Sequence, residues 1–176
     1  MLVGLIASTG LRISEALDLK FDDVEPDVGA LVIREGKFGK ARRVPLHPTV
    51  SEVLGRYIVV RRKIWADDRH LFLSAGKRRI GRSMANYTFR TIAKLAGIET
   101  GRARPCRIHD LRHTFATRSL EACSADRGSV AEHFVALSTY MGHTDIKHTY
   151  WYFEATPELM EGMARAAEAL MAGRPP

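Results

Sequence analysis

Apolar residues recur along most of this chain at the spacing of short amphipathic helices, and one region alternates as strands do. A Ser-Thr-Gly break at residues 8–10 separates the first two predicted helices. Between residues 29 and 46 the pattern changes to two β-like runs, 31–34 and 43–46, around a turn rich in glycine and lysine at 36–40. The pattern therefore predicts two short helices followed by a β-hairpin with a basic turn.

Helices are predicted to fill most of the remaining chain. Pro48 suits the first turn of a helix that runs to Ile64, and residues 70–73 form a candidate short strand. Ser83 is the expected N-cap of a further helix that Gly97 closes. Three more helices are expected at about 109–121, 129–141 and 157–171. The sequence thus predicts a mainly helical α+β fold with a small antiparallel sheet in its N-terminal third, in one domain over residues 1–176.

The charge of the chain indicates a polyanionic partner. The formal net charge is +7 over 176 residues, and the hydrophobic share of 45% is ordinary for a chain with a packed core. The positive residues cluster, several of them in predicted turns, where contacts with phosphates form readily. The clusters are Lys37, Lys40, Arg42 and Arg43; Arg61, Arg62 and Lys63; Lys77, Arg78, Arg79 and Arg82; and Arg102, Arg104 and Arg107. A nucleic acid is the expected partner.

Other features narrow the expected setting. Two cysteines, Cys106 and Cys123, cannot by themselves build a disulfide framework or a zinc site, which favours a reduced, intracellular environment. No apolar run approaches the roughly 20 residues of a membrane span, and the start of the chain lacks the positive charges of a signal peptide. Because the chain opens on core-forming residues, we expect further natural sequence before Met1.

An ordered set of side chains suits attack on a phosphodiester. An arginine can hold two phosphate oxygens through its planar fork, and a tyrosine hydroxyl can accept a phosphoryl group covalently. Each piece also has a structural interpretation, such as a surface ion pair between Arg12 and Glu15, a satisfied histidine at His143 and core packing for the aromatic run 150–153. The motifs are Thr9-Gly-Leu-Arg12-Ile-Ser-Glu15, His109-Asp-Leu-Arg112, Gly142-His143-Thr-Asp and Tyr152.

Taken together, these motifs resemble the tyrosine recombinase (phage integrase) family of site-specific DNA recombinases, as its C-terminal catalytic domain. The match includes the basic turn, residues 36–40, and the following Val44-Pro-Leu46. The resemblance implies a metal-independent reaction without a cofactor, in which a tyrosine forms a 3′-phosphotyrosyl link to DNA. It assigns catalysis to Arg12, Lys37, His109, Arg112, His143 and Tyr152. Glu15, one helical turn from Arg12, is expected to orient it. From the basic clusters, DNA contacts are expected from Lys40, Arg42, Arg43, Lys77, Arg78, Arg79 and Arg82.

The resemblance also implies partners and a location. We expect double-stranded DNA as the substrate and a homotetramer assembled on it through the helix at 157–171, in the cytoplasm of a prokaryotic cell, encoded by the cell itself, a phage or another mobile element. No membrane association is expected. The resemblance covers the catalytic domain, and we expect these 176 residues to lack the family's N-terminal DNA-clamping domain.

Several alternatives stay open from the sequence. Tyr150 is an alternative nucleophile, and Lys40 is an alternative to Lys37 as proton donor. The whole chain could instead be a DNA-binding module without catalysis, or an enzyme like the type IB topoisomerases. A metal-dependent nuclease is a further alternative, with ligands drawn from His109, Asp110, His113, His143, Asp145 and His148.

Overall fold

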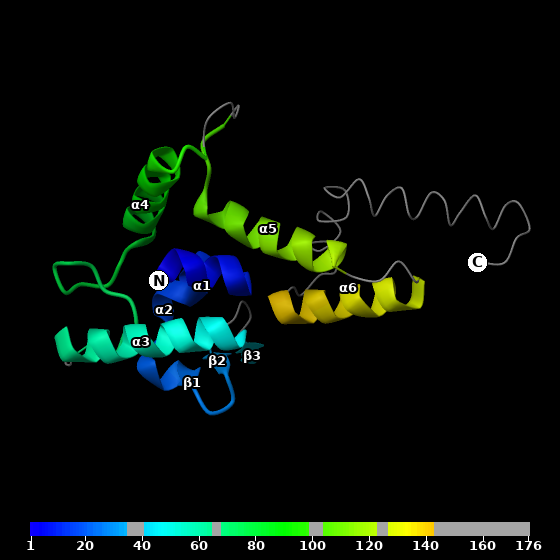
Figure 1. Cartoon of the computed structure of the whole chain (residues 1–176), viewed down its shortest axis with the longest axis horizontal. Helices are drawn as coiled ribbons and strands as arrows, with labels where there is room; N and C mark the ends of the chain where they lie inside the picture. Colours follow the sequence, from blue (N-terminus) through cyan, green and yellow to red (C-terminus); the bar gives the residue numbers. More distant parts are fainter. Residues whose placement is uncertain (35–40, 65–67, 99–103, 123–126, 143–176) are drawn as a thin grey trace, which may run out of the picture. The chain divides into compact units, whose positions relative to one another are not determined.

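The computed structural model describes residues 1–34, 41–64, 68–98, 104–122 and 127–142 (Figure 1). The chain divides into two compact units, residues 1–112 and residues 113–176. The prediction of a single domain over 1–176 stays a prediction.

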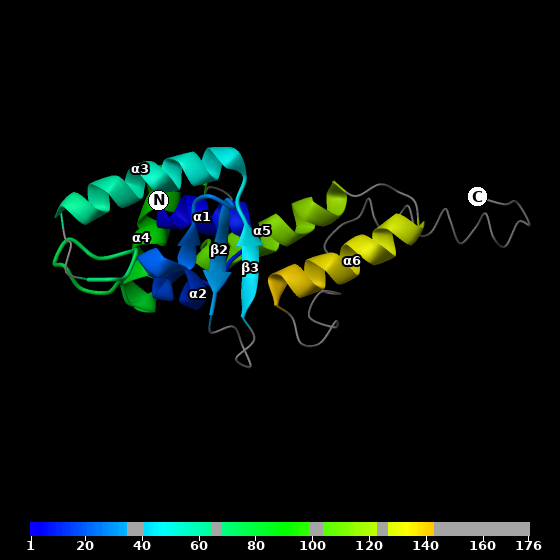
Figure 2. The ribbon, with the colours of Figure 1, turned by 90° about the horizontal axis from the view of Figure 1, so that it is seen from below.

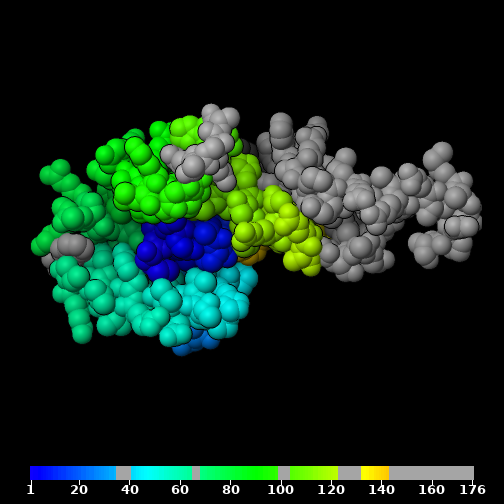
Figure 3. Space-filling model, turned by 45° about the horizontal axis from the view of Figure 1, so that its top comes forward, coloured from blue at the N-terminus to red at the C-terminus, as the bar shows by residue number. Residues whose placement is uncertain are grey.

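The N-terminal unit begins with two short helices, α1 (Leu2–Thr9) and α2 (Ile13–Asp18). The predicted break between them is confirmed. Gly10 ends α1 in the left-handed conformation, with φ 62°, which a residue without a Cβ adopts at little cost. The Gly10 N–H donates to the Ile6 carbonyl at 2.9 Å, as in a helix C-cap. The chain therefore turns sharply before Arg12. Part of α1 (blue) lies at the surface of this unit (Figure 3).

A small antiparallel sheet follows, with strand order β1-β2-β3 (Figure 2). It consists of β1 (Val24–Glu25), β2 (Ala30–Ile33) and β3 (Arg42–Pro45), so the predicted hairpin is confirmed. The register pairs Leu31 with Val44, both fully buried, and Ile33 with Arg42. The two-residue strand β1 was not predicted because it is too short to show an alternating pattern.

Two longer helices follow in the N-terminal unit: α3 (Pro48–Ile64) and α4 (Arg82–Leu95). Pro48 begins α3 as predicted, and Gly97, with φ 70°, follows α4 in the closing position predicted for it. The predicted N-cap of α4 is wrong. Gly81 is the N-cap and its carbonyl accepts the Ala85 N–H at 3.0 Å, so Ser83 lies inside the first turn with its side chain exposed.

The predicted strand at residues 70–73 is also wrong. Its two ends form isolated single-residue bridges instead, His70 with Lys20 and Leu73 with Arg79. Leu71 and Phe72 between them are buried, which explains the strand-like apolar signal. A short 3₁₀ helix, Phe21–Asp23, was not predicted either.

Two helices close the described chain, α5 (Ile108–Glu121) and α6 (Arg127–Met141), which confirms the helices predicted at about 109–121 and 129–141. They pack through the apolar side chains of Ala116, Leu120, Phe134, Leu137 and Met141. The rings of Phe115 and Tyr140 stack, with centroids 5.6 Å apart. The helix predicted at 157–171 lies outside the described residues. Within the described part of the chain, no helix is both long and apolar enough to cross a membrane.

Candidate active site

The turn that joins α1 to α2 is held by its own side chains. Thr9 is 2% exposed, and its hydroxyl donates to the Leu5 carbonyl at 2.5 Å. The Leu11 N–H points back to the Thr9 hydroxyl oxygen at 3.5 Å. Together with the left-handed Gly10, these bonds place Arg12 at the N-cap of α2.

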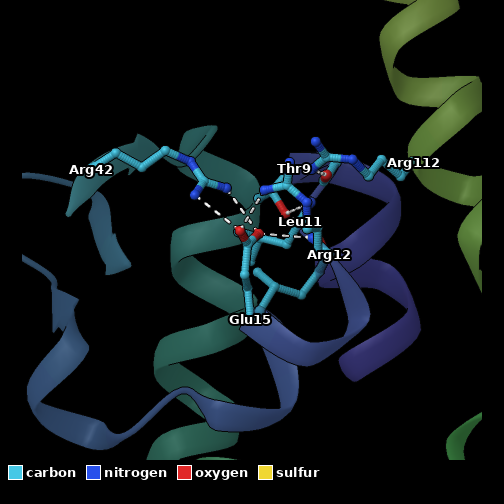
Figure 4. A network of polar contacts seen from close by, with 8 residues as sticks. Thr9, Leu11, Arg12, Glu15, Arg42 and Arg112 are labelled. Atoms are coloured by element: carbon cyan, nitrogen blue, oxygen red, sulfur yellow. Dashed lines mark hydrogen bonds and ion pairs between the residues drawn. The ribbon is translucent and has the colours of Figure 1, made fainter. Parts of the chain in front are cut away.

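The Glu15 carboxylate accepts four hydrogen bonds, which is the capacity of its two oxygens. Oε2 accepts the Arg12 backbone N–H at 2.9 Å and Arg42 Nη2 at 2.8 Å. Oε1 accepts Arg12 Nη1 at 2.9 Å and Arg42 Nη1 at 3.0 Å. Figure 4 shows Arg12 and Arg42 reaching the same carboxylate from different segments of the chain. The contact between Arg12 and Glu15 was expected from their spacing, and the presence of Arg42 was not.

The carboxylate is charged at neutral pH although it is buried. Burial raises the pKa of Glu15. The hydrogen bonds from Arg42 and Arg12 and the charge of Arg42 lower it by more than burial raises it, so the pKa lies below the ordinary value of 4.5. The side chains of Glu15, Arg42 and Arg12 are 4%, 14% and 23% exposed. The group is therefore a partly desolvated ion cluster, in which Arg12 keeps the largest exposed fraction.

Arg112 reaches the same turn from α5. It is 2% exposed, and its Nη1 donates to the Gly10 carbonyl at 2.5 Å across 102 residues of sequence. Figure 4 shows Arg112 reaching the turn that carries Thr9, Leu11 and Arg12. The fold thus brings together the two arginines that the sequence motifs singled out, by fixing both to one turn.

His109 lies in the first turn of α5, three residues before Arg112, and is exposed. Its neighbour Asp110 accepts the Arg107 N–H at 3.0 Å and lies close to the charges of Arg107 and Arg104. Partial burial raises the pKa of Asp110, and these donors and charges lower it below its usual range. Asp110 therefore serves as a partner for arginines at the start of the helix.

The predicted metal ligands do not form a cluster in the part of the chain that the structure describes, where no three histidine, cysteine or acidic residues gather around a common point. His143, Asp145 and His148 lie outside the described residues, as do Lys37, Lys40, Tyr150 and Tyr152. Their predicted roles stay predictions.

Most of the basic residues predicted to contact DNA are exposed where they are described. Arg43 pairs with Glu25 at the surface, and Arg79 pairs with Asp18. Lys77 has a left-handed backbone, φ 59°, in the turn closed by the Ser74 N–H donating to the Arg78 carbonyl at 2.8 Å. The exposed residues of this set are Arg43, Lys77, Arg78, Arg79 and Arg82.

Two arginines from the basic clusters have a different environment from the rest. Arg61 is 2% exposed, with Nη2 donating to the carbonyls of Asp68 and His70 at 3.3 and 3.0 Å, so it joins α3 to the following segment. Arg42 is turned toward Glu15. A signal for Arg42 was available in the sequence, because Arg42 and Val44 are two residues apart in a strand and share a face.

Sequence comparisons extend this picture. The model of the phage integrase family matches residues 1–158. The y4rB protein of Sinorhizobium fredii is 37% identical over 172 residues, which are 95% of this chain and 54% of that protein. Tyrosine recombinase XerA of Thermococcus kodakarensis is 30% identical over 178 residues, covering 97% of this chain and 57% of that protein. The chain spans about half the length of these curated relatives.

Solved structures of recombinases are also similar to this chain. A crystal structure of XerA recombinase superposes with a TM-score of 0.74 at 26% identity, covering 93% of this chain and 54% of that one. XerH site-specific recombinase bound to its difH substrate gives a TM-score of 0.72 at 25% identity, covering 95% of this chain and 45% of that one. With two arginines on one turn, a mainly helical fold and a family match over most of its length, the chain belongs to the phage integrase family.

Proposed function

We propose that this chain is the catalytic domain of a tyrosine-type site-specific DNA recombinase, which cuts and rejoins DNA through a 3′-phosphotyrosyl intermediate without metal or cofactor. The observation that carries the proposal is the meeting of Arg12 and Arg112 at the Thr9–Gly10 turn, in a chain of the phage integrase family. Two fixed guanidinium groups beside each other form a binding site for a phosphodiester.

The arginines suit stabilisation of a transition state. Negative charge grows on the non-bridging oxygens when a phosphodiester is attacked, and donors that are already in place stabilise that charge without reorganising. Glu15 holds Arg12 through both its backbone and its side chain, and the Gly10 carbonyl holds Arg112. The burial of Arg112 increases the strength of its field because little water screens it.

The remaining roles rest on the family resemblance. The Tyr152 phenolic oxygen forms a bond to phosphorus, and the bond from phosphorus to the 5′-oxygen breaks. A free tyrosine has a pKa of about 10, so a base is needed and His109 accepts the proton. His143 and the two arginines stabilise the negative charge that develops on the phosphate oxygens. Lys37 protonates the departing 5′-oxygen. The bond energy is retained in the phosphotyrosyl link, so a second DNA end can reverse the step.

Double-stranded DNA is the proposed partner. XerH site-specific recombinase, a structural relative, is bound to its difH substrate, and the Tn1549 transposon integrase, another, is in complex with circular intermediate DNA. The exposed Arg43, Lys77, Arg78, Arg79 and Arg82 are proposed to contact phosphates, together with Lys40. A tetramer assembled on DNA through the helix at 157–171, and a location in the cytoplasm of a prokaryotic cell, complete the proposal.

The test is to mix the protein with a randomised pool of nicked duplexes that trap covalent intermediates, in EDTA. An adduct that survives SDS and maps to Tyr152 by mass spectrometry supports the proposal. Tyr152→Phe is expected to abolish the adduct, and Tyr150→Phe is the matched control that keeps it. Cleavage that needs a divalent metal, or an adduct that persists in Tyr152→Phe, contradicts the proposal. DNA binding without any adduct favours a module without catalysis.

A further inference from the structure

We propose that Arg42 is a positioning residue for Arg12, acting through Glu15 rather than by touching DNA. The inference rests on the proposed function, because it gives Arg12 its role at the phosphodiester. It differs from the assignment that the basic cluster of the sequence favours, in which Arg42 contacts a phosphate.

The contacts of Arg42 point toward Glu15. Nη1 and Nη2 of Arg42 donate to separate oxygens of Glu15, at 3.0 and 2.8 Å, in the two-pronged geometry that an arginine forms with a carboxylate. The Arg42 side chain is 14% exposed, and that of Glu15 is 4% exposed. A guanidinium that is held by both prongs and largely covered is poorly placed to meet a DNA backbone.

The same carboxylate carries Arg12. Glu15 accepts the Arg12 backbone N–H and its Nη1, both at 2.9 Å, so every prong of Arg42 bonds an oxygen that also bonds Arg12. Two parallel bonds from a planar fork fix the plane of a carboxylate, which a single bond leaves free to rotate. Arg42 thereby determines the direction in which Glu15 presents its oxygens to Arg12.

Another arginine of the same hairpin provides a contrast. Arg34, directly after β2, bonds the buried Asp23 through Nε at 2.6 Å, with 61% of its side chain exposed. Asp23 accepts the Lys20 N–H at 2.9 Å and thus holds the 3₁₀ turn at Phe21–Asp23. Arg34 therefore stabilises the buried carboxylate of Asp23, and its hydrogen bonds go to Asp23 and to the Asp22 carbonyl. It is a matched control for Arg42.

The first experiment separates positioning from DNA contact. Single-turnover rates of adduct formation at saturating nicked DNA are compared for the full chain and for Arg42→Gln, Arg42→Lys and Arg34→Gln. A displacement of about 1 Å in a reacting group can cost about 10²-fold in rate, so Arg42→Gln is expected to lose about that factor, with DNA affinity and its salt dependence unchanged. Arg42→Lys keeps the charge but lacks the fork and is expected to recover little of the rate. Arg34→Gln is expected to stay within about twofold of the unaltered protein.

The opposite result overturns the inference. If Arg42 contacts a phosphate, Arg42→Gln lowers affinity, reduces the slope of log affinity against log salt by about 1, and keeps the rate at saturation. Recovery of the full rate by Arg42→Lys also overturns it, because charge alone would then suffice.

A second readout needs no activity. The Nε–Hε resonance of Arg12 in a ¹⁵N spectrum reports the surroundings of its guanidinium. It is expected to shift in Arg42→Gln and Arg42→Lys and to stay in place in Arg34→Gln. If the unaltered protein forms no adduct, the proposed function fails and this spectrum alone decides the inference. An unshifted Arg12 resonance in a folded Arg42 variant overturns the inference. If Arg42→Gln does not fold, the spectrum of Arg42→Lys is used instead.

Discussion

Two adjacent arginines on β3 form ion pairs in different environments, one largely buried and the other exposed. Arg42 bonds both oxygens of Glu15 at 3.0 and 2.8 Å, and Arg43 bonds both oxygens of Glu25 at 3.0 and 3.2 Å. Both pairs are bidentate over similar distances, through Nη1 and Nη2 for Arg42 and through Nε and Nη2 for Arg43. They differ in exposure, because the side chains of the first pair are 14% and 4% exposed and those of the second pair are 71% and 28% exposed. Hydrogen bonds of similar length therefore need not have equal consequences for stability.

The difference follows from strand alternation. Successive side chains point to opposite faces, so Arg42 shares a face with the buried Val44 and Arg43 points outward. An exposed pair is screened by water and salt and contributes little to stability. A buried pair leaves an uncompensated charge when one partner is removed, which is strongly destabilising. We expect the inward pair to matter for stability and chemistry, and the outward one to matter for contacts at the surface.

The largest effect is expected from Glu15→Gln. The change removes the charge that Arg12 and Arg42 share, and it leaves both guanidinium groups beside each other in a poorly solvated place. The free energy of unfolding is expected to fall by about 3 to 5 kcal/mol, the range for a broken buried pair. Urea unfolding followed by circular dichroism measures it. Glu25→Gln is the matched variant, and a comparable loss there would remove the distinction between the two pairs.

A smaller loss is expected from Arg42→Gln. Glu15 keeps its two hydrogen bonds from Arg12 in this variant. The free energy of unfolding is therefore expected to fall by about 3 kcal/mol, the lower end of the same range. Arg43→Gln is expected to leave the urea midpoint almost unchanged. Equal midpoints for the two variants would contradict the comparison.

Acid is expected to reduce the difference between the unaltered protein and Arg42→Gln. The lowered pKa of Glu15 gives a contribution to stability that is complete above pH 4.5 and is lost as pH falls through the pKa of the folded state. Arg42→Gln removes a main cause of that lowering, so little of this contribution remains to be lost. Melting temperatures measured from pH 7 to pH 3 are expected to converge. A constant gap across this range is the contrary result.

The smallest effect concerns salt. The coupling between Arg43 and Glu25, measured by a double-mutant cycle, is expected to vanish when the ionic strength rises to about 1 M, where the Debye length is about 3 Å. The coupling between Arg42 and Glu15 is expected to keep most of its value because little water separates the groups. Equal salt dependence of the two couplings would show that both pairs are solvated.

Local features of this molecule were predictable from its sequence. The glycine break at Gly10, the hairpin and the contact between Arg12 and Glu15 each depend on residues close together in the chain. The N-cap of α4 was wrong because a serine has a strong preference for that position, whereas the backbone of Gly81 was already suited to it. Local preference alone could not decide between them.

Contacts between distant segments were not predictable in the same way. The motifs suggested that Arg12 and Arg112 act together, but the means by which they meet, a bond from Arg112 to the Gly10 carbonyl, depends on how α5 packs. The burial of Arg61 and Arg42 could not be predicted from the clusters of positive charge, because clustering in the sequence does not show which side chains point inward. Alternation along β3 was the available signal for Arg42.

The most direct test of the difference between Arg42 and Arg43 measures two quantities for Arg42→Gln and Arg43→Gln. These are the DNA affinity and the rate of covalent adduct formation at saturating DNA. We predict that Arg42→Gln lowers the rate about 10²-fold and leaves the DNA affinity near that of the unaltered protein. Arg43→Gln is expected to weaken the affinity, with a salt slope smaller by about 1, and to keep the rate at saturation. A reversed pattern, or the same profile for both variants, would contradict it.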